Sequence, residues 1–295
     1  PRVLQVHKYY APYVGGMERV VQDIAEGLRD EYDFRVLVCG RRTSREVRNG
    51  VTVIRAAMPA VALSMPLSLQ FYPLLRSESR QADLLHFHPP FPLAESAALL
   101  DGLEGKRVVA TYHHDVVRQR WLNPVYGPVL RSFLRRCERV IVSSARLRDC
   151  SPALRDVREK CVIVPFGFSA DRSTEAIPLP EDFVLFAGRL VPYKGADVLV
   201  RAMREFDAPV VFVGDGPLGK SLRALAVKLG VADRARFVGR LSGPRLRYCF
   251  SKCRLFVLPS VMTTEAFGIV QVEAMSYGKP VVNTALPTGV PEVSR

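Results

Sequence analysis

Short apolar strands that alternate with amphipathic helices are the feature that most constrains the fold of this chain. The run VLQV at 3–6 is followed by a glycine-containing loop, by apolar residues at helical spacing within 17–28, and by the apolar run FRVLVCG at 34–40. A strand–helix–strand unit of this kind pairs its two strands in parallel through a right-handed crossover. The pattern therefore predicts an α/β fold with a doubly wound, Rossmann-like sheet.

The alternation continues along the chain and is interrupted once. Residues 168–182 are polar and contain Pro178 and Pro180, as is typical of a linker. We therefore expect one domain at 1–168 and another at 183–295, facing each other across a cleft because ligands of such sheets bind beyond the carboxyl ends of the strands.

Further strands are predicted at 51–54, 83–88, 107–113, 139–144 and 162–167, and then at 183–188, 209–214, 236–239, 255–260 and 280–283. Helices of the second domain are predicted from about 196, at 218–230, at 243–252 and from about 267 to 278. No closing helix follows, so we expect the second domain to be truncated at Arg295.

Charge and cysteine usage restrict the class of protein. Hydrophobic residues make up 48% of the 295 residues, which is enough for globular cores, and the six cysteines are scattered without a C-x-x-C pair. This usage is typical of reduced thiols in a cytoplasmic protein. No signal peptide and no apolar run of roughly 18 residues is present, so membrane contact is expected to be peripheral.

The formal charge of +13 is concentrated in residues 117–160, which contain eleven Lys or Arg against four acidic residues. Such a segment attracts anionic lipid or phosphorylated ligands, although a solvated basic face is the plain alternative. Nucleic acid is not expected as a partner, because the segment lacks interleaved aromatic residues and any nucleic-acid motif.

Two glycine-containing loops follow predicted strands. GDGPLG at 214–219 matches the G-x-G-x-x-G of a dinucleotide site, but the next strand ends in Arg240 instead of the acid that such a site requires, and a simple turn is the alternative. Gly15 and Gly16 lie where the first strand turns into the first helix, a position that suits a phosphate or sugar as well as a plain turn.

All five histidines lie in the first half of the chain. His86 and His88 alternate on a predicted strand and point the same way, which permits a metal pair, although no acidic or cysteine ligand stands beside them. His113, His114 and Asp115 end another strand, at the edge where ligands of this architecture bind. A buried histidine with no role in binding is the alternative for each of these positions.

Charged residues in the second half suggest a site for a phosphorylated ligand. Arg189 and Lys194 share the short loop GRLVPYKG, where two cations suit a diphosphate but a solvated loop fits equally. Glu265 precedes a predicted helix and Glu273 lies within it. Eight residues of helix span about 12 Å, whereas the carboxylates of glycosidases lie roughly 5 to 9.5 Å apart. The two glutamates therefore fit hydroxyl acceptors for one long ligand better than an acid–base pair.

Taken together, these segments resemble the retaining glycosyltransferases of the large group-4 family, which have the two-domain GT-B fold. The likeness extends over essentially the whole chain, and the order of the segments is its strongest signal. They are YYAPYVGGME (9–18), DLLHFHPP (83–90), TYHHD (111–115), VPFG (164–167), GRLVPYKG (188–195), VGDGP (213–217), FVGRLS (237–242) and EAFGIVQVEAMSYGKPVV (265–282).

The resemblance implies roles for individual residues. Arg189 and Lys194 would stabilise the diphosphate of a nucleotide-sugar as the sugar leaves. Glu265 would bind hydroxyls of the transferred sugar, Glu273 would bind the ribose, and His113 would lie near the donor sugar. The remaining positions in the donor-binding set are Gly15, Gly16, Phe267, Gly268 and Ile269. His114 and Asp115 are possible additions to the site. A second histidine, His114, stands where related sequences have a small residue after the first.

The resemblance also implies a reaction and its partners. Transfer would retain the anomeric configuration and need no metal or cofactor, in agreement with the absence of a D-x-D sequence. LPTGVPEVS (286–294) and TYHHDVV (111–117) look most like bacterial O-antigen and exopolysaccharide enzymes, several of which are mannosyltransferases. GDP-mannose is therefore favoured as donor and a glycan or lipid-linked molecule as acceptor, with 117–160 facing an anionic membrane at the inner face of the plasma membrane. Related chains continue past the position of Arg295, with a final helix that crosses back onto the first domain.

Three other functions remain open from the sequence. A non-catalytic protein could bind a nucleotide-sugar or phosphorylated glycan through the same residues, although the full set of Arg189, Lys194, Glu265 and Glu273 argues against lost activity. A nicotinamide-dependent oxidoreductase would use GDGPLG, and an epimerase of the same fold would cleave the sugar from its nucleotide.

Overall fold

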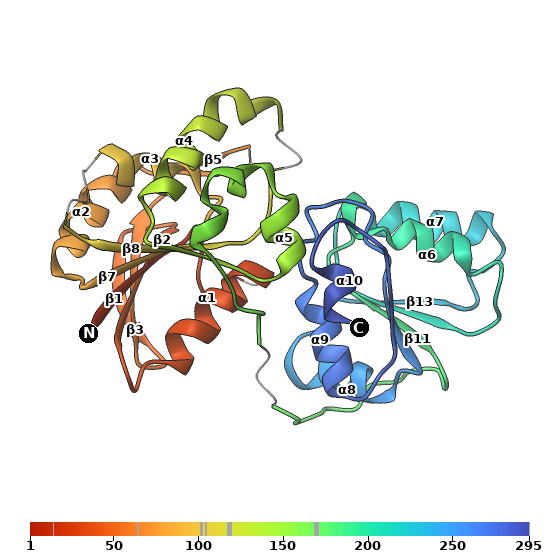
Figure 1. Cartoon of the computed structure of the whole chain (residues 1–295). Helices are drawn as coiled ribbons and strands as arrows, with labels where there is room; N and C mark the ends of the chain where they lie inside the picture. The colour runs from red at the N-terminus through yellow and green to blue at the C-terminus, as the bar shows by residue number, and fades with distance from the viewer. Residues whose placement is uncertain are drawn as a thin grey trace. The chain divides into compact units, whose positions relative to one another are not determined.

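A computed structural model of the chain describes residues 1–13, 15–63, 65–100, 103, 105–116, 120–167 and 171–294. It divides into two compact units, Pro1–Phe166 and Gly167–Arg295 (Figure 1). The division falls close to the predicted end of the first domain.

The first unit is built on a sheet of eight strands in the order β10-β9-β8-β7-β1-β2-β4-β3, in which all neighbours are parallel except β3 and β4. Its strands are β1 (Arg2–Val6), β2 (Asp33–Gly40), β3 (Ser44–Arg48), β4 (Val51–Ala57), β7 (Leu84–Phe87), β8 (Arg107–Tyr112), β9 (Arg139–Val142) and β10 (Cys161–Ile163), with a separate hairpin of β5 (Ala60–Ala62) and β6 (Met65–Leu67). Its helices are α1 (Gly16–Gly27), α2 (Phe71–Gln81), α3 (Pro92–Leu100), α4 (Asn123–Arg136), α5 (Ala145–Cys150) and the 3-10 helices η1 (Arg120–Leu122) and η2 (Pro152–Lys160). All seven strands predicted for this domain are confirmed.

Both faces of this sheet are covered by helices, as the pattern predicts for parallel strands. In β1, Leu4 and Val6 point into a core shared with α2, α3 and α4, while Val3 points into a second core shared with Val21 of α1. Figure 1 shows α1 on the opposite face from α3 and α4. The alternation of side chains along a strand therefore explains why β1 is apolar on both sides.

The structure contains elements that the sequence analysis did not predict, among them α2 and α4. Helix α2 buries Phe71 and Leu75 but is otherwise mainly polar, and α4 contains Gly127 and Pro128 in its interior. Sparse apolar anchors and helix-breaking residues weaken the helical pattern. Tertiary packing against the sheet stabilises these helices instead.

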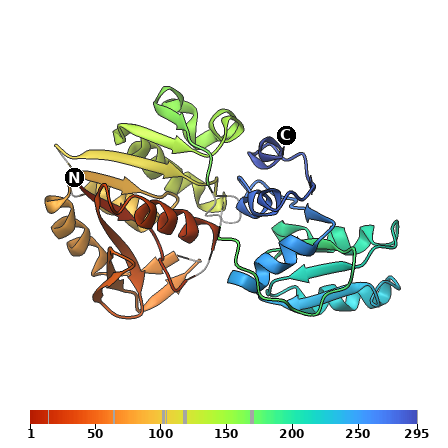
Figure 2. The ribbon, with the colours of Figure 1, turned by 90° about the horizontal axis from the view of Figure 1, so that it is seen from below.

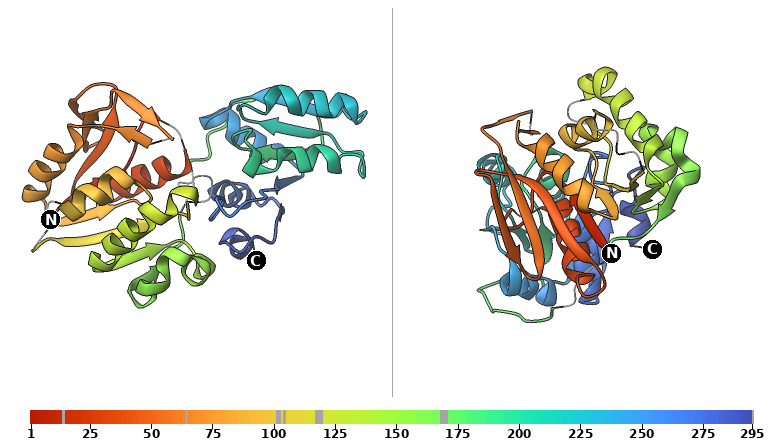
Figure 3. Two further views of the ribbon diagram at one scale, coloured as in Figure 1. Left: turned by 90° about the horizontal axis from the view of Figure 1, so that it is seen from above. Right: turned by 90° about the vertical axis from the view of Figure 1, so that its left-hand side faces the viewer.

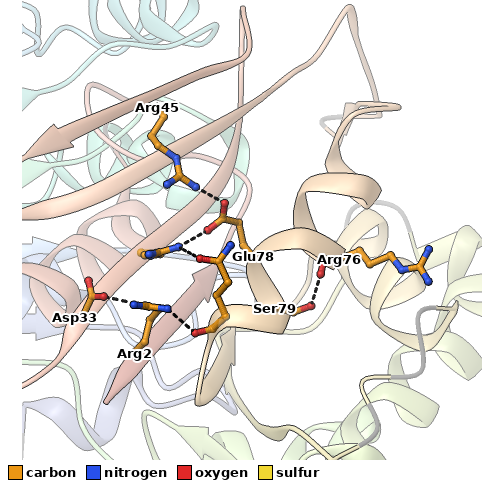
Figure 4. A network of polar contacts seen from close by, with 8 residues as sticks. Arg2, Asp33, Arg45, Arg76, Glu78 and Ser79 are labelled. Atoms are coloured by element: carbon orange, nitrogen blue, oxygen red, sulfur yellow. Dashed lines mark hydrogen bonds and ion pairs between the residues drawn. The ribbon is translucent and has the colours of Figure 1, made fainter.

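A buried carboxylate attaches α2 to two strands of the sheet (Figure 4). Glu78 is almost fully buried and pairs with Arg35 of β2 at 2.9 Å and with Arg45 of β3. Arg35 also donates to the side chain of Gln81, at 3.0 Å. A buried charge is tolerated only when it is paired, so this network fixes the position of α2.

The second unit has a parallel sheet of five strands in the order β13-β12-β11-β14-β15. Its strands are β11 (Val184–Ala187), β12 (Val210–Val213), β13 (Ala235–Gly239), β14 (Leu255–Leu258) and β15 (Val281–Asn283). Its helices are η3 (Pro192–Lys194), α6 (Ala196–Ala202), α7 (Gly219–Lys228), α8 (Gly243–Lys252), α9 (Ile269–Ser276) and α10 (Val290–Val293). The five predicted strands and the four predicted helices of this domain are confirmed.

Two cores on opposite faces of β11 hold this unit together. Phe186 packs with residues of α6 and α7, whereas Leu185 packs with residues of α8 and α9. Each unit is therefore a three-layer, doubly wound α/β domain (Figure 2, Figure 3).

The described part of the predicted linker lies along the second unit. Ile177 and Leu179 pack against its core, and Glu175 pairs with Arg245 of α8 at 2.6 Å. Residues 168–170 lie outside the described residues.

Candidate functional site

In the second unit, the predicted site residues lie at the point where the strand order reverses. β12 and β13 follow β11 on one side of the sheet, whereas β14 and β15 lie on the other side. The loops after β11 and β14 lie at such a point, and ligands of open α/β sheets bind there, beyond the carboxyl ends of the strands. The first of these loops carries Arg189 and Lys194, and the second carries Glu265.

Close backbone packing brings these two loops together. Gly195 has a φ of +65°, and a Cβ atom there would lie 1.9 Å from the carbonyl oxygen of Pro259. The backbone N–H of Val261 donates to the carbonyl of Tyr193 at 2.9 Å. Glycine is required at 195 both for its left-handed conformation and for this approach.

Lys194 and Glu265 form an ion pair with Nζ 2.5 Å from Oε2. Their side chains are only 12% and 10% exposed, and the hydroxyl of Ser260 donates to the same carboxylate oxygen at 3.1 Å. Burial alone would lower the pKa of Lys194, but the carboxylate of Glu265, followed by Tyr193, raises it above its usual value. The pair therefore holds a permanent cation beside a carboxylate acceptor at the switch point.

The start of α9 forms the other side of this region. Gly268 is its N-cap with a φ of +72°, and a Cβ atom there would lie 2.5 Å from Cδ2 of Leu258. Phe267 is buried, Ile269 begins the helix, and Glu273 lies half-buried one turn further on. Free N–H groups in the first turn of a helix favour an anion. Arg189 is exposed and forms no ion pair within the described part of the chain.

The glycines of GDGPLG make room for the protein's own backbone. A Cβ atom at Gly214 would lie 1.9 Å from the carbonyl oxygen of Gly188, and one at Gly216 would lie 2.4 Å from that of Leu190. The backbone N–H of Leu190 donates to the carbonyl of Asp215 at 2.9 Å. The motif therefore serves as a support for the loop that carries Arg189 and Lys194.

We expect Gly214→Ala to destabilise the second unit by more than about 2 kcal/mol, because the new methyl group overlaps a carbonyl oxygen and the φ of Gly214 is +140°. Gly219→Ala is the matched control within the same motif, since its Cβ would make only an ordinary contact, 3.7 Å from Leu190. Denaturant titration of both variants measures the difference. Equal loss of stability in the two would contradict the assigned role of Gly214.

In the first unit, Gly15 and Gly16 begin α1 after β1. Gly15 is the N-cap in an extended conformation, and the carboxylate of Glu18 lies 2.2 Å from the position of a Cβ atom at Gly15. Glu18 therefore lies over the end of the helix where a phosphate was predicted. Apart from its chain neighbours and the backbone of α1, no described atom lies within 4 Å of a Cβ atom built at Gly16.

Four of the five histidines form a buried cluster where β1, β7 and β8 end. The ring centroids of His86 and His88 are 4.3 Å apart, those of His88 and His113 are 5.3 Å apart, and that of His7 lies 5.8 Å from His88. Burial lowers the pKa of His7 to about 3 and that of His86 to about 4, and it lowers those of His88 and His113 well below the usual value. The cluster is therefore neutral at physiological pH.

His86 and His88 lie on the same face of the sheet, as their spacing predicts. Nε2 of His86 lies 2.7 Å from Oγ1 of Thr111, and Nδ1 of His88 lies 3.0 Å from Nε2 of His113. Within the described ranges, no group of three or more His, Cys, Asp or Glu side chains is arranged to hold a metal ion.

The next two residues after His113 face other partners. Nδ1 of His114 lies 2.8 Å from the carbonyl oxygen of Asp115. One carboxylate oxygen of Asp115 accepts from Tyr112 at 2.8 Å and from Ser151 at 2.7 Å. Asp115 thus fixes the loop after β8, and His113 is the one of the two histidines that joins the cluster.

Sequence reasoning did not identify Ser260, Thr111 or Ser151 as neighbours of these residues. Ser260 directly follows β14, and Thr111 is two residues before His113 on β8. The place of Ser260 and Thr111 at the carboxyl ends of strands was the available signal, but serine and threonine are too common there to be singled out, and Ser151 follows α5.

The basic segment 117–160 spans η1, α4, β9, α5 and η2, and residues 117–119 lie outside the described residues. Several of its charges are already paired, including Arg148 with Asp149 at 2.8 Å and Arg135 with Asp156 at 3.7 Å. Trp121 of η1 and Val125 in the first turn of α4 are 65% and 75% exposed. No helix in the described ranges is both long enough and apolar enough to cross a bilayer.

Two doubly wound α/β domains in one chain are the architecture of the GT-B fold. The crystal structure of Anabaena HepE in complex with UDP superposes with a TM-score of 0.78 at 21% identity, over 100% of this chain and 83% of that one. The lipopolysaccharide outer core galactosyltransferase WaaB superposes with a TM-score of 0.69 at 15% identity, over 100% and 84%. These likenesses confirm the fold.

The chain belongs to glycosyltransferase family 4. Residues 14–172 match the model described as Glycosyltransferase Family 4, and residues 168–295 match the one described as Glycosyl transferases group 1. D-rhamnosyltransferase WbpZ of Pseudomonas aeruginosa is 32% identical over 98% of this chain and 78% of its own length. O-antigen chain mannosyltransferase C of Escherichia coli is 29% identical over 98% of this chain and 80% of its own length.

Proposed function

We propose that this glycosyltransferase moves a sugar, with retention and without a metal or cofactor, from a nucleotide-diphosphate sugar to a glycan or lipid-linked acceptor in cell-surface polysaccharide synthesis. The observation that carries the proposal is the buried Lys194–Glu265 pair at the switch point of the second unit. A fixed cation, a carboxylate acceptor and the start of α9 together match the charge pattern of a sugar diphosphate.

In this proposal, the second unit binds the donor. Lys194 and Arg189 stabilise the negative charge that develops on the diphosphate as the bond from C1 of the sugar to phosphate breaks. Glu265 accepts hydrogen bonds from sugar hydroxyls, and Glu273 accepts them from the ribose. Backbone N–H groups of Phe267, Gly268 and Ile269 contact phosphate or sugar.

Retention follows if the acceptor attacks C1 from the face that the phosphate leaves. The electron pair of the broken bond goes to the phosphate oxygen, and that oxygen takes the proton of the acceptor hydroxyl. The proposal assigns Glu265 the role of a hydrogen-bond acceptor and not that of a nucleophile. One oxygen of its carboxylate is held by Lys194 at 2.5 Å and by Ser260 at 3.1 Å.

GDP-mannose is the favoured donor. The support is that one relative is named as a mannosyltransferase of the O-antigen chain. The same name supports cell-surface polysaccharide synthesis as the pathway.

The proposal is tested first by thermal-shift measurements with UDP-, GDP- and ADP-sugars and with NAD(P)H. Nucleotide release is then measured with and without acceptor, in the presence of EDTA. We expect stabilisation by GDP-mannose, acceptor-dependent release of GDP, and a product whose anomeric configuration by NMR matches that of the donor. Stabilisation by a nucleotide-sugar without turnover would favour a binding protein, and stabilisation by NAD(P)H alone would overturn the proposal.

Glu273→Ala is expected to weaken donor binding about tenfold or more, because a hydrogen bond to a charged acceptor contributes about 1.5–3 kcal/mol. The variant should leave kcat at saturating donor much less affected. Isothermal titration with GDP-mannose measures the first quantity and nucleotide release the second. Unchanged affinity would remove Glu273 from the donor site.

We further propose that residues 117–160 bring the protein to the inner face of the plasma membrane. The exposed Trp121 and Val125 add apolar surface to the basic segment. Because each basic residue near an anionic surface contributes about 1 kcal/mol, Arg136→Glu/Arg139→Glu should weaken binding to phosphatidylglycerol vesicles about tenfold or more.

Co-sedimentation of the protein with vesicles is the measurement. The double variant Arg201→Glu/Arg204→Glu makes the same charge change at exposed positions of the second unit and is the matched control. Binding that does not depend on anionic lipid, or that falls equally in both variants, would sink the membrane proposal.

A further inference from the structure

His88 contacts His113 through a single pair of ring nitrogens. Nδ1 of His88 lies 3.0 Å from Nε2 of His113, and the planes of the two rings are 24° apart. The two residues are 25 positions apart in the sequence, at the ends of the adjacent strands β7 and β8. Their contact is therefore a product of strand pairing and not of local sequence.

Both rings are neutral, because burial and the neighbouring histidines lower the pKa of each well below its usual value. A neutral imidazole has one N–H donor and one bare nitrogen acceptor. Of the two facing nitrogens, one must therefore donate and the other accept.

The second nitrogen of His88 indicates which one donates. Nε2 of His88 is buried and has no hydrogen-bond partner among the described residues. If Nδ1 of His88 accepted, Nε2 would carry a buried N–H group without an acceptor, which is rarer and less favourable than a bare buried nitrogen. The geometry thus favours a proton on Nδ1 of His88.

We propose that His88 is a positioning residue that donates from Nδ1 to Nε2 of His113 and thereby fixes His113 in the tautomer with its proton on Nδ1. His113 then has one free polar function, an N–H donor. It can donate a hydrogen bond to a ligand oxygen but cannot accept a proton there. Its use on a sugar hydroxyl rests on the proposed function, whereas the tautomer itself does not.

Neighbouring side chains keep the two rings in place. His86, whose Nε2 lies 2.7 Å from Thr111, packs against His88 with ring centroids 4.3 Å apart. Phe166 covers His113 at 5.6 Å between ring centroids. The ring of His113 therefore has little freedom to rotate away from His88.

Substitution of His88 by asparagine or by glutamine tests which of its two ring nitrogens makes the contact with His113. The side-chain amide of Asn reaches about as far as Nδ1 of a histidine ring, whereas that of Gln reaches about as far as Nε2. His88→Asn should therefore keep a donor for His113, and His88→Gln should lose it.

The first test is two-bond proton–nitrogen NMR correlation on protein labelled with nitrogen-15 in its five histidines, with His113 assigned through His113→Gln. We expect His113 to carry its proton on Nδ1 in the wild type and in His88→Asn, and to show a mixture of tautomers in His88→Gln. A proton on Nε2 of His113 in the wild type would overturn the proposal.

The second test is kinetic and applies only if turnover is found. His88→Gln should lower kcat about tenfold to a hundredfold, the loss found when a metal-bound histidine loses its orienting partner, while His88→Asn should recover most of it with the same melting temperature. Equal loss in both variants would show a packing role only. If neither the wild type nor the variants turn over any nucleotide-sugar, the proposed function fails, and the NMR result still decides the tautomer.

Discussion

Lys194→Ala is expected to lower kcat by about 10²–10³-fold, the usual loss when one fixed donor to a developing charge is removed. The cation lies 2.5 Å from Glu265 and is 12% exposed, so solvent cannot readily replace it. Donor affinity should change less than turnover, because the charge on the phosphate grows as the sugar leaves. Steady-state nucleotide release with GDP-mannose gives both quantities.

Two further variants separate charge from packing. Lys194→Met keeps an unbranched side chain over Gly188, where a Cβ atom would lie 3.6 Å from Cδ and Cε of the lysine. Because removing one partner of a buried ion pair costs about 3–5 kcal/mol, Lys194→Met/Glu265→Gln should be more stable than Lys194→Met alone. Lys228→Ala, at an exposed position of α7, is the control for loss of a lysine. Turnover at the wild-type level in Lys194→Ala would refute the site.

Acidification is expected to destabilise the first unit strongly through its histidine cluster. The folded-state pKa values of His7, His86, His88 and His113 lie below the usual 6.5 because the rings are buried. Below pH 6.5 the unfolded chain binds protons that the folded chain does not, so the free energy of unfolding falls as pH falls toward the folded pKa values. At pH 5 each histidine accounts for about 2 kcal/mol of this loss.

Glu95 works in the opposite direction. It is buried, and burial raises its pKa to about 7, although its carboxylate accepts from the backbone N–H of Phe91 at 2.7 Å. The unfavourable ionisation of Glu95 disappears as pH falls from 7 toward 4.5. The free energy regained in this way offsets the loss caused by about one of the four histidines. The net loss at pH 5 is still several kcal/mol, a large share of the stability of a typical domain.

Guanidinium titration followed by circular dichroism at pH 7.5 and pH 5.0 measures this loss. His86→Gln keeps a polar atom near Thr111 but cannot titrate, so its loss on acidification should be smaller than that of the wild type by the share of one histidine. The second unit contains no histidine and should respond much less. Equal stability of the wild type at the two pH values would contradict the prediction.

The sequence pattern predicts some strands and helices of this protein and misses others. The strands that were predicted were recognisable because each is a short apolar run bounded by glycine, proline or polar residues, whereas β3, β5 and β6 were not predicted. Helices α2 and α4 were not, because polar residues in one and Gly127 and Pro128 in the other interrupt the helical pattern. Their stability comes from packing on the sheet, which no local pattern records.

The site residues divide in the same way. Arg189, Lys194, Glu265 and Glu273 were identified from residue type, from their place after predicted strands, and from the family resemblance. That Lys194 and Glu265 pair with each other was not predicted, because the contact depends on the close approach of Gly195 to Pro259. GDGPLG is the opposite case. Its sequence matches a dinucleotide-binding motif, but in the structure its glycines make room for the neighbouring loop that carries Arg189 and Lys194.

The sequence by itself therefore determined two doubly wound domains and the strand ends at which charged residues collect, because alternation and loop glycines are local properties. Only the tertiary structure decided which of those residues meet. It joined Lys194 to Glu265 and His88 to His113. The physical reason is that such contacts require the parallel pairing of strands that are distant in sequence, and a shift of one residue in that pairing would turn the side chains to the other face.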